Sequence, residues 1–288
     1  MFVIHIIMLF IFILTLACVF HKSFVEMLPV GISSLVLLLY VLSFGRHLGW
    51  IDGIAPLLLC GVVLYFFTRK REQRKELLRQ CIEILKDPST IAGIILLLLV
   101  VIGVSGKVVS WWDDYNFWAT DVKSIFYRNG FADKYANAAP EFGDYPPGTQ
   151  MMKWWFLHFS PGQFREGLLF AGYYVFNLSF LLPLLHYIRK KMPLSMTLGA
   201  IFWCDGGCAD FSMAVVYGAF LVAVIDRKDV SPWLYYGRQA LYLMVLVLCK
   251  NTGFVWYVFA VLFSIGVQIL NRRMGEDLWQ KRTAMLGT

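Results

Sequence analysis

Two adjacent carboxylates stand where an apolar run of this sequence ends. Asp113 and Asp114 directly follow Trp111 and Trp112, and the stretch 111–158 holds six of the chain's nineteen Asp and Glu residues. Carboxylates at the end of a membrane-spanning run are costly unless they face a water-filled cavity or meet a cation, so they are candidates for a functional site. An ionised carboxylate within hydrogen-bond reach of a hydroxyl group can act as a general base.

A rigid turn lies further along the same loop. Asp144 and Tyr145 precede Pro146, Pro147 and Gly148. Two consecutive prolines fix the backbone dihedral φ, and glycine takes conformations that other residues rarely adopt. Alone this motif is a weak signal, because an ordinary loop turn has the same composition. Its place in one loop with the acidic pair makes the two motifs more informative together.

Other polar residues also interrupt or end apolar runs. Asp210 follows a Cys204–Cys208 stretch rich in turn residues, and Lys250 opens a Lys-Asn-Thr-Gly turn. Each candidate has a structural alternative. Asp is a preferred helix N-cap, which applies to Asp113 and Asp114 as well as to Asp210. A lysine at a helix end often extends toward water and does nothing more.

The aromatic residues near the turn also have a purely structural interpretation. Lys153, Trp154 and Trp155 are typical of the aromatic belt at a membrane surface, and this reading is favoured over a site that stacks on sugars. His158 is interpreted as an interfacial side chain and not as a ligand. Cys204 and Cys208 are spaced so that they could pair or bind a metal, but no second Cys or His cluster supports this.

Composition assigns the chain to the membrane. Hydrophobic residues make up 59%, charged residues 16%, and the mean hydropathy is +0.63. These values lie outside the range of soluble domains, and several apolar runs approach the roughly 20 residues that cross a bilayer. The net charge of +7 comes from short Lys and Arg clusters between apolar runs. It therefore indicates membrane topology and argues against nucleic acid as a partner.

The apolar runs predict an all-α, polytopic transmembrane bundle of about nine spans, forming one transmembrane domain over 1–288. The positive-inside rule places the basic loop 69–90 in the cytoplasm. Alternation from this anchor puts the N-terminus and the loop 110–164 on the outer face. The first run lacks a basic start and a cleavage site, which favours a span over a cleaved signal peptide. The predicted spans are 1–20, 27–44, 50–68, 91–109, 167–188, two within 194–225, 233–249 and 254–270.

The outer loop is predicted to carry a juxtamembrane amphipathic helix over 114–127. Its apolar residues Tyr115, Trp118, Val122 and Ile125 recur at spacings of three and four, and the polar residues fall elsewhere on the helical wheel. Such a helix lies in the membrane interface, with its Trp and Tyr rings at the level of the headgroups.

These motifs together resemble the GT-C superfamily of membrane glycosyltransferases, whose bacterial members use polyprenyl-phosphate-linked sugars. The resemblance covers roughly 110–257. It rests on an Asp pair after a span, the amphipathic helix, the Asp144-Tyr-Pro-Pro-Gly-Thr149 turn, Asp210 at the start of an outer-facing helix, and the Lys250-Asn-Thr-Gly253 turn. Several predicted spans precede the acidic loop, where many members have one, and the chain ends earlier than many relatives. The resemblance is therefore compatible with a truncated member of the superfamily or a fragment of one.

The resemblance implies roles for individual residues. Sugar transfer from a lipid phosphate needs a base for the acceptor hydroxyl and cations for the phosphate leaving group. Asp113 is the first choice for the base and Asp114 the second. Asp210 would orient the acceptor or assist a metal. Single displacement predicts inversion at the anomeric carbon. The implied substrate-binding residues are Lys123, Arg128, Asp144, Tyr145 and Lys250.

The expected partners are a polyprenyl-phosphate-linked sugar, membrane lipid, and an envelope glycan, lipid or protein as acceptor, at a site on the outer face of the cell membrane. No cofactor is certain, although two or more carboxylates could hold a divalent metal. A secondary transporter is the first alternative, and it would need broken helices at mid-membrane. A non-catalytic membrane protein is the second.

Overall fold

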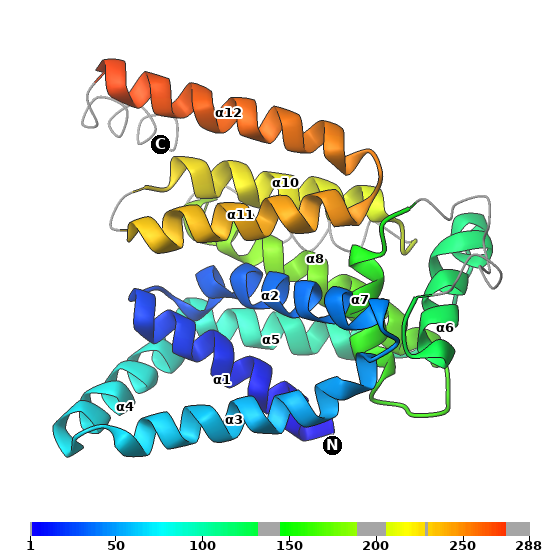
Figure 1. Ribbon diagram of the computed structural model, residues 1–288, viewed down its shortest axis with the longest axis horizontal. Helices are drawn as coiled ribbons and strands as arrows, with labels where there is room; N and C mark the ends of the chain where they lie inside the picture. Colours follow the sequence, from blue (N-terminus) through cyan, green and yellow to red (C-terminus); the bar gives the residue numbers. More distant parts are fainter. Residues whose placement is uncertain (1, 132–144, 189–205, 228–229, 275–288) are drawn as a thin grey trace.

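The computed structural model is all-helical, and it describes residues 2–131, 145–188, 206–227 and 230–274 (Figure 1). These residues form eleven α-helices, with a short 3-10 turn, η1 (Leu48–Trp50), and a π-helical turn, η2 (Asp114–Trp118). The all-α prediction is therefore confirmed. The helices are α1 (Phe2–Phe20), α2 (Phe24–Phe44), α3 (Ile51–Thr68), α4 (Arg71–Lys86), α5 (Pro88–Gly103), α6 (Ala119–Arg128), α7 (Gly148–Leu157), α8 (Glu166–Ile188), α10 (Ala209–Ile225), α11 (Pro232–Cys249) and α12 (Gly253–Met274).

Several helices begin where the sequence supplies an N-cap. The Ser23 hydroxyl accepts a hydrogen bond from the backbone N–H of Glu26, whose side chain returns to Ser23. Asp87 caps α5 and is followed by proline, and Ser231 caps α11 in the same way. Proline at the first helical position has no N–H to leave unsatisfied and a backbone φ suited to the helix. These caps fix where the long apolar helices start.

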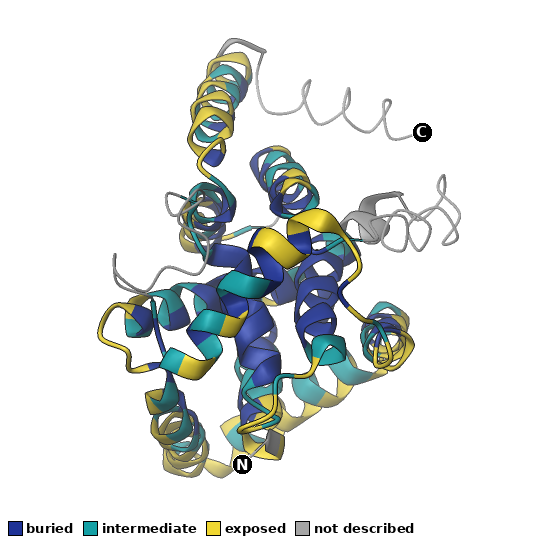
Figure 2. Ribbon diagram, turned by 90° about the vertical axis from the view of Figure 1, so that its right-hand side faces the viewer, coloured by how far each residue is buried: buried dark blue, intermediate teal, exposed yellow. Residues whose placement is uncertain are grey.

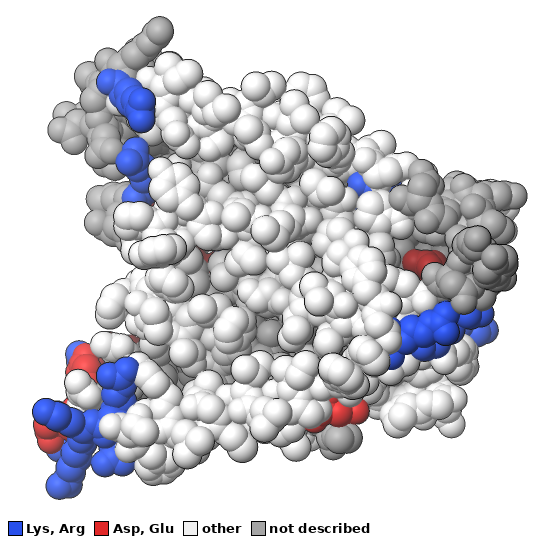
Figure 3. Space-filling model, viewed as in Figure 1, with Lys and Arg blue, Asp and Glu red and all other residues white. Residues whose placement is uncertain are grey.

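The long helices run between two ends of the molecule (Figure 1). One end carries α4 and the turns after α1 and α10. The other carries α6, α7, the turn between α2 and α3, and the turn between α11 and α12. Figure 3 shows the Lys and Arg side chains of α4 gathered at the first end, with a broad uncharged band between the two ends. An apolar band bounded by charged ends suits a bilayer.

The helices α7 and α8 lie at the centre of the bundle, where Figure 2 shows the buried residues concentrated. All ten residues of α7 are buried, and α7 contacts α2, α6, α8 and α11. The expectation of a membrane-surface aromatic belt at Lys153, Trp154 and Trp155 is therefore wrong. These three side chains are at most 2% exposed, because α7 inserts among other helices and does not lie on the membrane surface.

The predicted count of about nine spans is wrong. By length and composition, four described helices can cross a membrane, or five if the bent pair α4 and α5, which meet at 63°, forms one span. The predicted count treated every long apolar run as a separate span. Instead α5 has 16 residues and α10 has 17, both shorter than the roughly 20 that a bilayer requires. The helix α11 carries buried Arg238 and Gln239. The predicted hairpin within 194–225 is described only from residue 206.

The candidate spans indicate a multi-pass membrane protein. They are Val3–Phe20, Phe24–Phe44, Leu48–Thr68 and Gly253–Arg272. In the third and fourth only 11% and 17% of the residues are buried, so α3 and α12 turn most of their apolar side chains outward. Exposed apolar helices of this length are suited to contact with lipid.

Candidate functional site

The predicted site residues that the structure describes lie at the end of the bundle that carries α6 and α7 (Figure 1). Asp210 is in the first turn of α10, and Lys250 directly follows α11. Asp144 lies outside the described residues. The other predicted residues at this end are Asp113, Asp114, Lys123, Arg128 and Tyr145.

Three side chains hold the backbone just before α10. The Gly207 N–H donates to both carboxylate oxygens of Asp114, at 3.0 Å each. The Lys153 ammonium donates to the Gly207 carbonyl at 2.7 Å, and the Tyr173 hydroxyl donates to the carbonyl of Cys208 at 3.0 Å. Because Asp114 follows α5, Lys153 lies in α7 and Tyr173 in α8, this segment ties three parts of the bundle to the start of α10.

The backbone at Gly207 is closely approached by these side chains. A Cβ atom there would stand 3.0 Å from the Asp114 Oδ1 and 3.3 Å from the Lys153 Nζ. A larger residue at this position would therefore require the carboxylate and the ammonium to shift by a few tenths of an ångström.

The π-helical turn η2 separates the environments of the acidic pair. Asp113 is exposed, whereas Asp114 is only 1% exposed. The turn closes with a hydrogen bond from the Ala119 N–H to the Asp114 carbonyl, five residues back. Asp113 precedes this turn and makes no side-chain cap hydrogen bond, so capping does not explain it. Such π turns often occur at functional sites.

The same turn changes which residues of the predicted amphipathic helix are buried. Trp118, Val122 and Ile125 are buried as expected, but Tyr115 is 60% exposed. A π turn contains more residues than a regular α turn, so the apolar face expected from a 3.6-residue period does not continue through it. The predicted helix therefore exists, as η2 followed by α6, with its first turn rotated.

Asp210 forms an ion pair with Lys250. The ammonium lies 2.9 Å and 3.0 Å from the two carboxylate oxygens of Asp210, and 5.6 Å from the ring centre of Tyr145. The N-cap of α10 is Cys208 and not Asp210. Partial burial by itself lowers the pKa of Lys250, but the hydrogen bond and charge of Asp210 outweigh it and the net shift is upward. The Lys250 side chain therefore does more than extend into water.

An aromatic group lies between the two lysines of the site. The rings of Trp118 and Tyr145 are stacked with centroids 5.8 Å apart, and Phe117 meets the Tyr145 ring edge-on at 5.1 Å. The Lys153 ammonium is 5.6 Å from the Trp118 ring centre, and the Lys250 ammonium is on the Tyr145 ring. Cations near aromatic faces are stabilised by the ring quadrupole. The aromatic group thus links the buried lysine to the partly exposed one.

Two carboxylates, the buried Asp114 and the partly buried Asp121, interact with the charge of Lys153. Burial raises the pKa of Asp114, and the charge of Lys153 and the Gly207 N–H oppose this shift. Burial likewise raises the pKa of Asp121 to about 6, opposed by the Gln150 amide and the Lys153 ammonium. Lys153 itself is fully buried. A charged side chain at such a position needs nearby carboxylates or polar groups, which this end of the bundle provides.

Lys123 and Arg128 lie apart from this cluster. Both are on α6, where Lys123 is exposed above the Phe164 ring, with its ammonium 5.5 Å from the ring centre. Among the described residues, neither side chain forms an ion pair with Asp114 or Asp210. The structure thus brings Asp210, Lys250 and Tyr145 into contact. It anchors Asp114 to the segment that leads to Asp210, and it leaves Lys123 and Arg128 on α6, outside these contacts.

Sequence reasoning missed Lys153, Gly207 and Tyr173. One signal was available for Lys153, since it is a lone charge between Met152 and Trp154 in an apolar helix, and such residues are functional candidates by default. Nothing in the sequence indicated that a backbone segment more than fifty residues later would bind it. Comparison with family models, curated proteins and solved structures gave no significant match to this chain.

Proposed function

We propose that this chain is a membrane glycosyltransferase that moves a sugar from a polyprenyl-phosphate donor to an envelope acceptor. One observation carries the proposal. Carboxylates and ammonium groups that are far apart in the sequence come together at one end of an apolar bundle, as the Asp114, Gly207 and Lys153 contacts and the Asp210–Lys250 pair show. A lipid phosphate would reach such a site from the bilayer while its acceptor arrived from water.

Asp113 is the proposed general base. Its carboxylate is exposed, so an acceptor hydroxyl can approach it, whereas both oxygens of Asp114 already accept from Gly207. Asp113 would take the hydroxyl proton as the acceptor oxygen attacks the anomeric carbon. The bond from that carbon to the phosphate oxygen would break, and its electron pair would leave with polyprenyl phosphate. A single displacement of this kind inverts the anomeric configuration.

Asp114 acts in this proposal as a positioning residue. It is held by Gly207, and it is the first residue of the π turn, directly after Asp113. Losing its charge would leave the buried Lys153 with less compensation, so the change would affect folding as well as activity. Asp113 has no such buried partner among the described residues.

Lys250 is the proposed phosphate ligand. Its side chain is 18% exposed and its partner Asp210 is 56% exposed, so a ligand from solvent or lipid can reach the pair. A phosphate would compete with Asp210 for the ammonium and form charge-assisted hydrogen bonds with it. Asp210, once released, would be free to accept from the acceptor sugar. Lys123 and Arg128, on α6, would add longer-range attraction for the phosphate.

The test uses the purified full-length chain in lipid vesicles with a panel of polyprenyl-phosphate hexoses and pentoses, and it measures released polyprenyl phosphate. We expect Asp113→Asn to lower the rate by at least about 100-fold, since a positioned base contributes about that much or more. Its melting temperature should match the parent. Asp114→Asn should lower both the rate and the melting temperature. Glu72→Gln, an exposed change on α4 at the other end, is the matched control.

Lys250→Met separates binding from the proton transfer. It should raise KM for the lipid-phosphate donor, with a small effect on stability, because exposed ion pairs contribute only about 0–1 kcal/mol. Full activity in Asp113→Asn would refute the proposed base, whatever the activity of Asp114→Asn. Sugar uptake into vesicles without any lipid-phosphate donor would instead support a transporter.

A further inference from the structure

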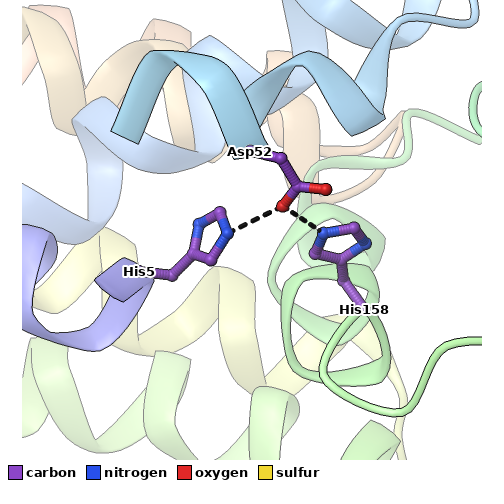
Figure 4. Close-up of side chains that lie close together, drawn as sticks. All are labelled: His5, Asp52 and His158. Atoms are coloured by element: carbon purple, nitrogen blue, oxygen red, sulfur yellow. Dashed lines mark hydrogen bonds and ion pairs between the residues drawn. The ribbon is translucent and has the colours of Figure 1, made fainter. Parts of the chain in front are cut away.

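A second group of chemically active side chains lies outside the proposed site. His5 in α1, Asp52 in α3 and His158 directly after α7 point toward one another (Figure 4). The Nε2 atom of His5 lies 2.8 Å from the Asp52 Oδ1, and the Nε2 atom of His158 lies 2.9 Å from the same oxygen. One nitrogen or oxygen atom from each residue lies within 4.8 Å of the other two. Among the described residues, this is the one group of three or more potential ligands that converges in this way.

Burial of the polar His5 imidazole costs free energy unless its nitrogen atoms have partners. The His5 side chain is 1% exposed, and it stands in a helix that is otherwise apolar except for Thr15. Its Nδ1 atom is buried and has no hydrogen-bond partner among the described residues. An ionisable side chain in a candidate span is a functional-site candidate by default.

The donor set suits a particular class of ligand. Two imidazole nitrogens and one carboxylate oxygen form a set used by Zn²⁺ and by other divalent transition metals, whereas Ca²⁺ and Mg²⁺ prefer oxygen ligands alone. In a tetrahedral site, metal–nitrogen and metal–oxygen bonds of about 2.0–2.2 Å place neighbouring ligand atoms about 3.3–3.6 Å apart. The nitrogen–oxygen distances are 2.8 Å and 2.9 Å, so side-chain rotations that open each by about half an ångström would admit an ion.

The surroundings would hold the rings while leaving the group open on one side. The His158 ring is stacked on Trp154 with centroids 4.8 Å apart, and the His5 ring meets the His158 ring at 88°. Asp52 is 28% exposed and His158 is 22% exposed, which gives solvent a route to the group. Three protein ligands with one accessible position describe a zinc site in which water is the fourth ligand.

We infer that His5, Asp52 and His158 bind one divalent transition-metal ion of the Zn²⁺ type. The ion joins the start of α1, the start of α3 and the end of α7. Since α7 also carries Lys153, the metal fixes the position of a helix that the proposed glycosyltransferase site uses. The inference stands without that function, because it rests only on the three ligands.

The test measures metal binding directly on the full-length chain, purified in detergent without a polyhistidine tag. After incubation with Zn²⁺ and removal of unbound ion, elemental analysis should find about one zinc per chain. Replacement by Co²⁺ should give the visible absorption bands of a nitrogen- and oxygen-ligated ion. Added Zn²⁺ should also raise the melting temperature, because it binds the folded state.

Two variants separate a metal site from a hydrogen-bonded contact between helices. Asp52→Asn keeps an oxygen that can accept from both imidazoles but removes the charged ligand, and His158→Gln removes one nitrogen. Each should weaken zinc binding by at least about 100-fold, since even second-shell changes cost up to that much. His47→Gln is the matched control, because His47 is exposed at the same end and stacks on Trp50.

The outcomes are distinct. Zinc bound by the parent and by His47→Gln but lost from both other variants supports the site. A parent chain that binds no zinc overturns the inference, as does equal zinc binding in Asp52→Asn. Because metal content is measured without any sugar donor, either result leaves the glycosyltransferase proposal to its own test.

Discussion

Asp113 and Asp114 are neighbours in the sequence, yet the first is exposed and the second is buried. Asp113 precedes the π turn, whereas Asp114 is its first residue and accepts from the Gly207 N–H. The first carboxylate is open to solvent while the second holds the segment before α10. A pair of like charges is thereby divided between two roles, and the buried member lies near Lys153, whose charge opposes the rise in its pKa.

Asp121 gives a prediction about pH. Burial raises its pKa to about 6, above the ordinary value of about 3.9 for an unfolded chain. The folded state therefore binds the proton of the Asp121 carboxyl group more tightly than the unfolded state does. The stability that this tighter binding contributes is complete below about pH 4 and is lost as the pH rises through about 6. Asp121→Asn should raise the melting temperature by a few degrees near pH 8 and change it little near pH 4.

Intrinsic Trp fluorescence during heating would follow the unfolding of this variant. Glu72→Gln on α4 is the control. The difference in melting temperature between this variant and the parent should be the same at the two pH values. If Asp121→Asn lowered the melting temperature most at high pH, the ionised carboxylate would be stabilising the fold, and the sign of our argument would be reversed.

Residue types alone predicted part of the site. Asp210 and Lys250 were expected on the same face of the membrane, but their ion pair was not predicted. Lys153 was misread because its flanking Trp residues are typical of the membrane surface, and burial depends on which helices enclose α7. The contribution of Gly207 is a backbone N–H and carbonyl, which every non-proline residue possesses. No side-chain pattern in one sequence can distinguish it.

At the scale of the elements, the contact between α7 and α8 determines where Lys153 lies. A Cβ atom on Gly172 would stand 2.5 Å from the Met152 carbonyl oxygen and 2.7 Å from the Lys153 Cα. Gly172→Ala should therefore force the two helices apart and destabilise the protein by about 1–3 kcal/mol. Thermal unfolding in detergent measures this change.

Gly218→Ala is the matched control for that substitution. Gly218 lies inside α10, and a Cβ atom there would meet nothing within 4 Å. Alanine should be neutral or stabilise the helix by up to about 1 kcal/mol. Equal destabilisation by the two substitutions would mean that the close packing of α7 on α8 is not formed.

The helices were easier to predict than the spans. Apolar runs and caps such as Ser23 and Ser231 mark the helices well, because both signals are local. The number of spans depends on which apolar helices contact lipid and which are enclosed by protein. Helix α7 shows the difference, since its ten residues are fully enclosed although its composition resembles that of a membrane surface.

For the whole molecule, the two ends provide a prediction of orientation. If the basic end with α4 is cytoplasmic, Lys75→Cys should react with an impermeant maleimide only after cells are permeabilised. Asn116→Cys, exposed on the turn η2, should react in intact cells. Both single cysteines would be placed in a chain whose native cysteines are replaced. Labelling of Lys75→Cys in intact cells would show that the orientation is the opposite one, with the proposed site in the cytoplasm.

The contact between Lys153 and Gly207 also bears on how the chain is made. Gly207 follows Lys153 by 54 residues, so at about 5–20 residues per second the ribosome supplies this partner about 3–10 seconds later. Helix α11, which encloses another side of α7, is synthesised later still. During that interval only carboxylates made earlier, Asp114 and Asp121, can compensate the charge of Lys153. The polar contacts that enclose Lys153 are therefore complete only after the segment before α10 has been synthesised.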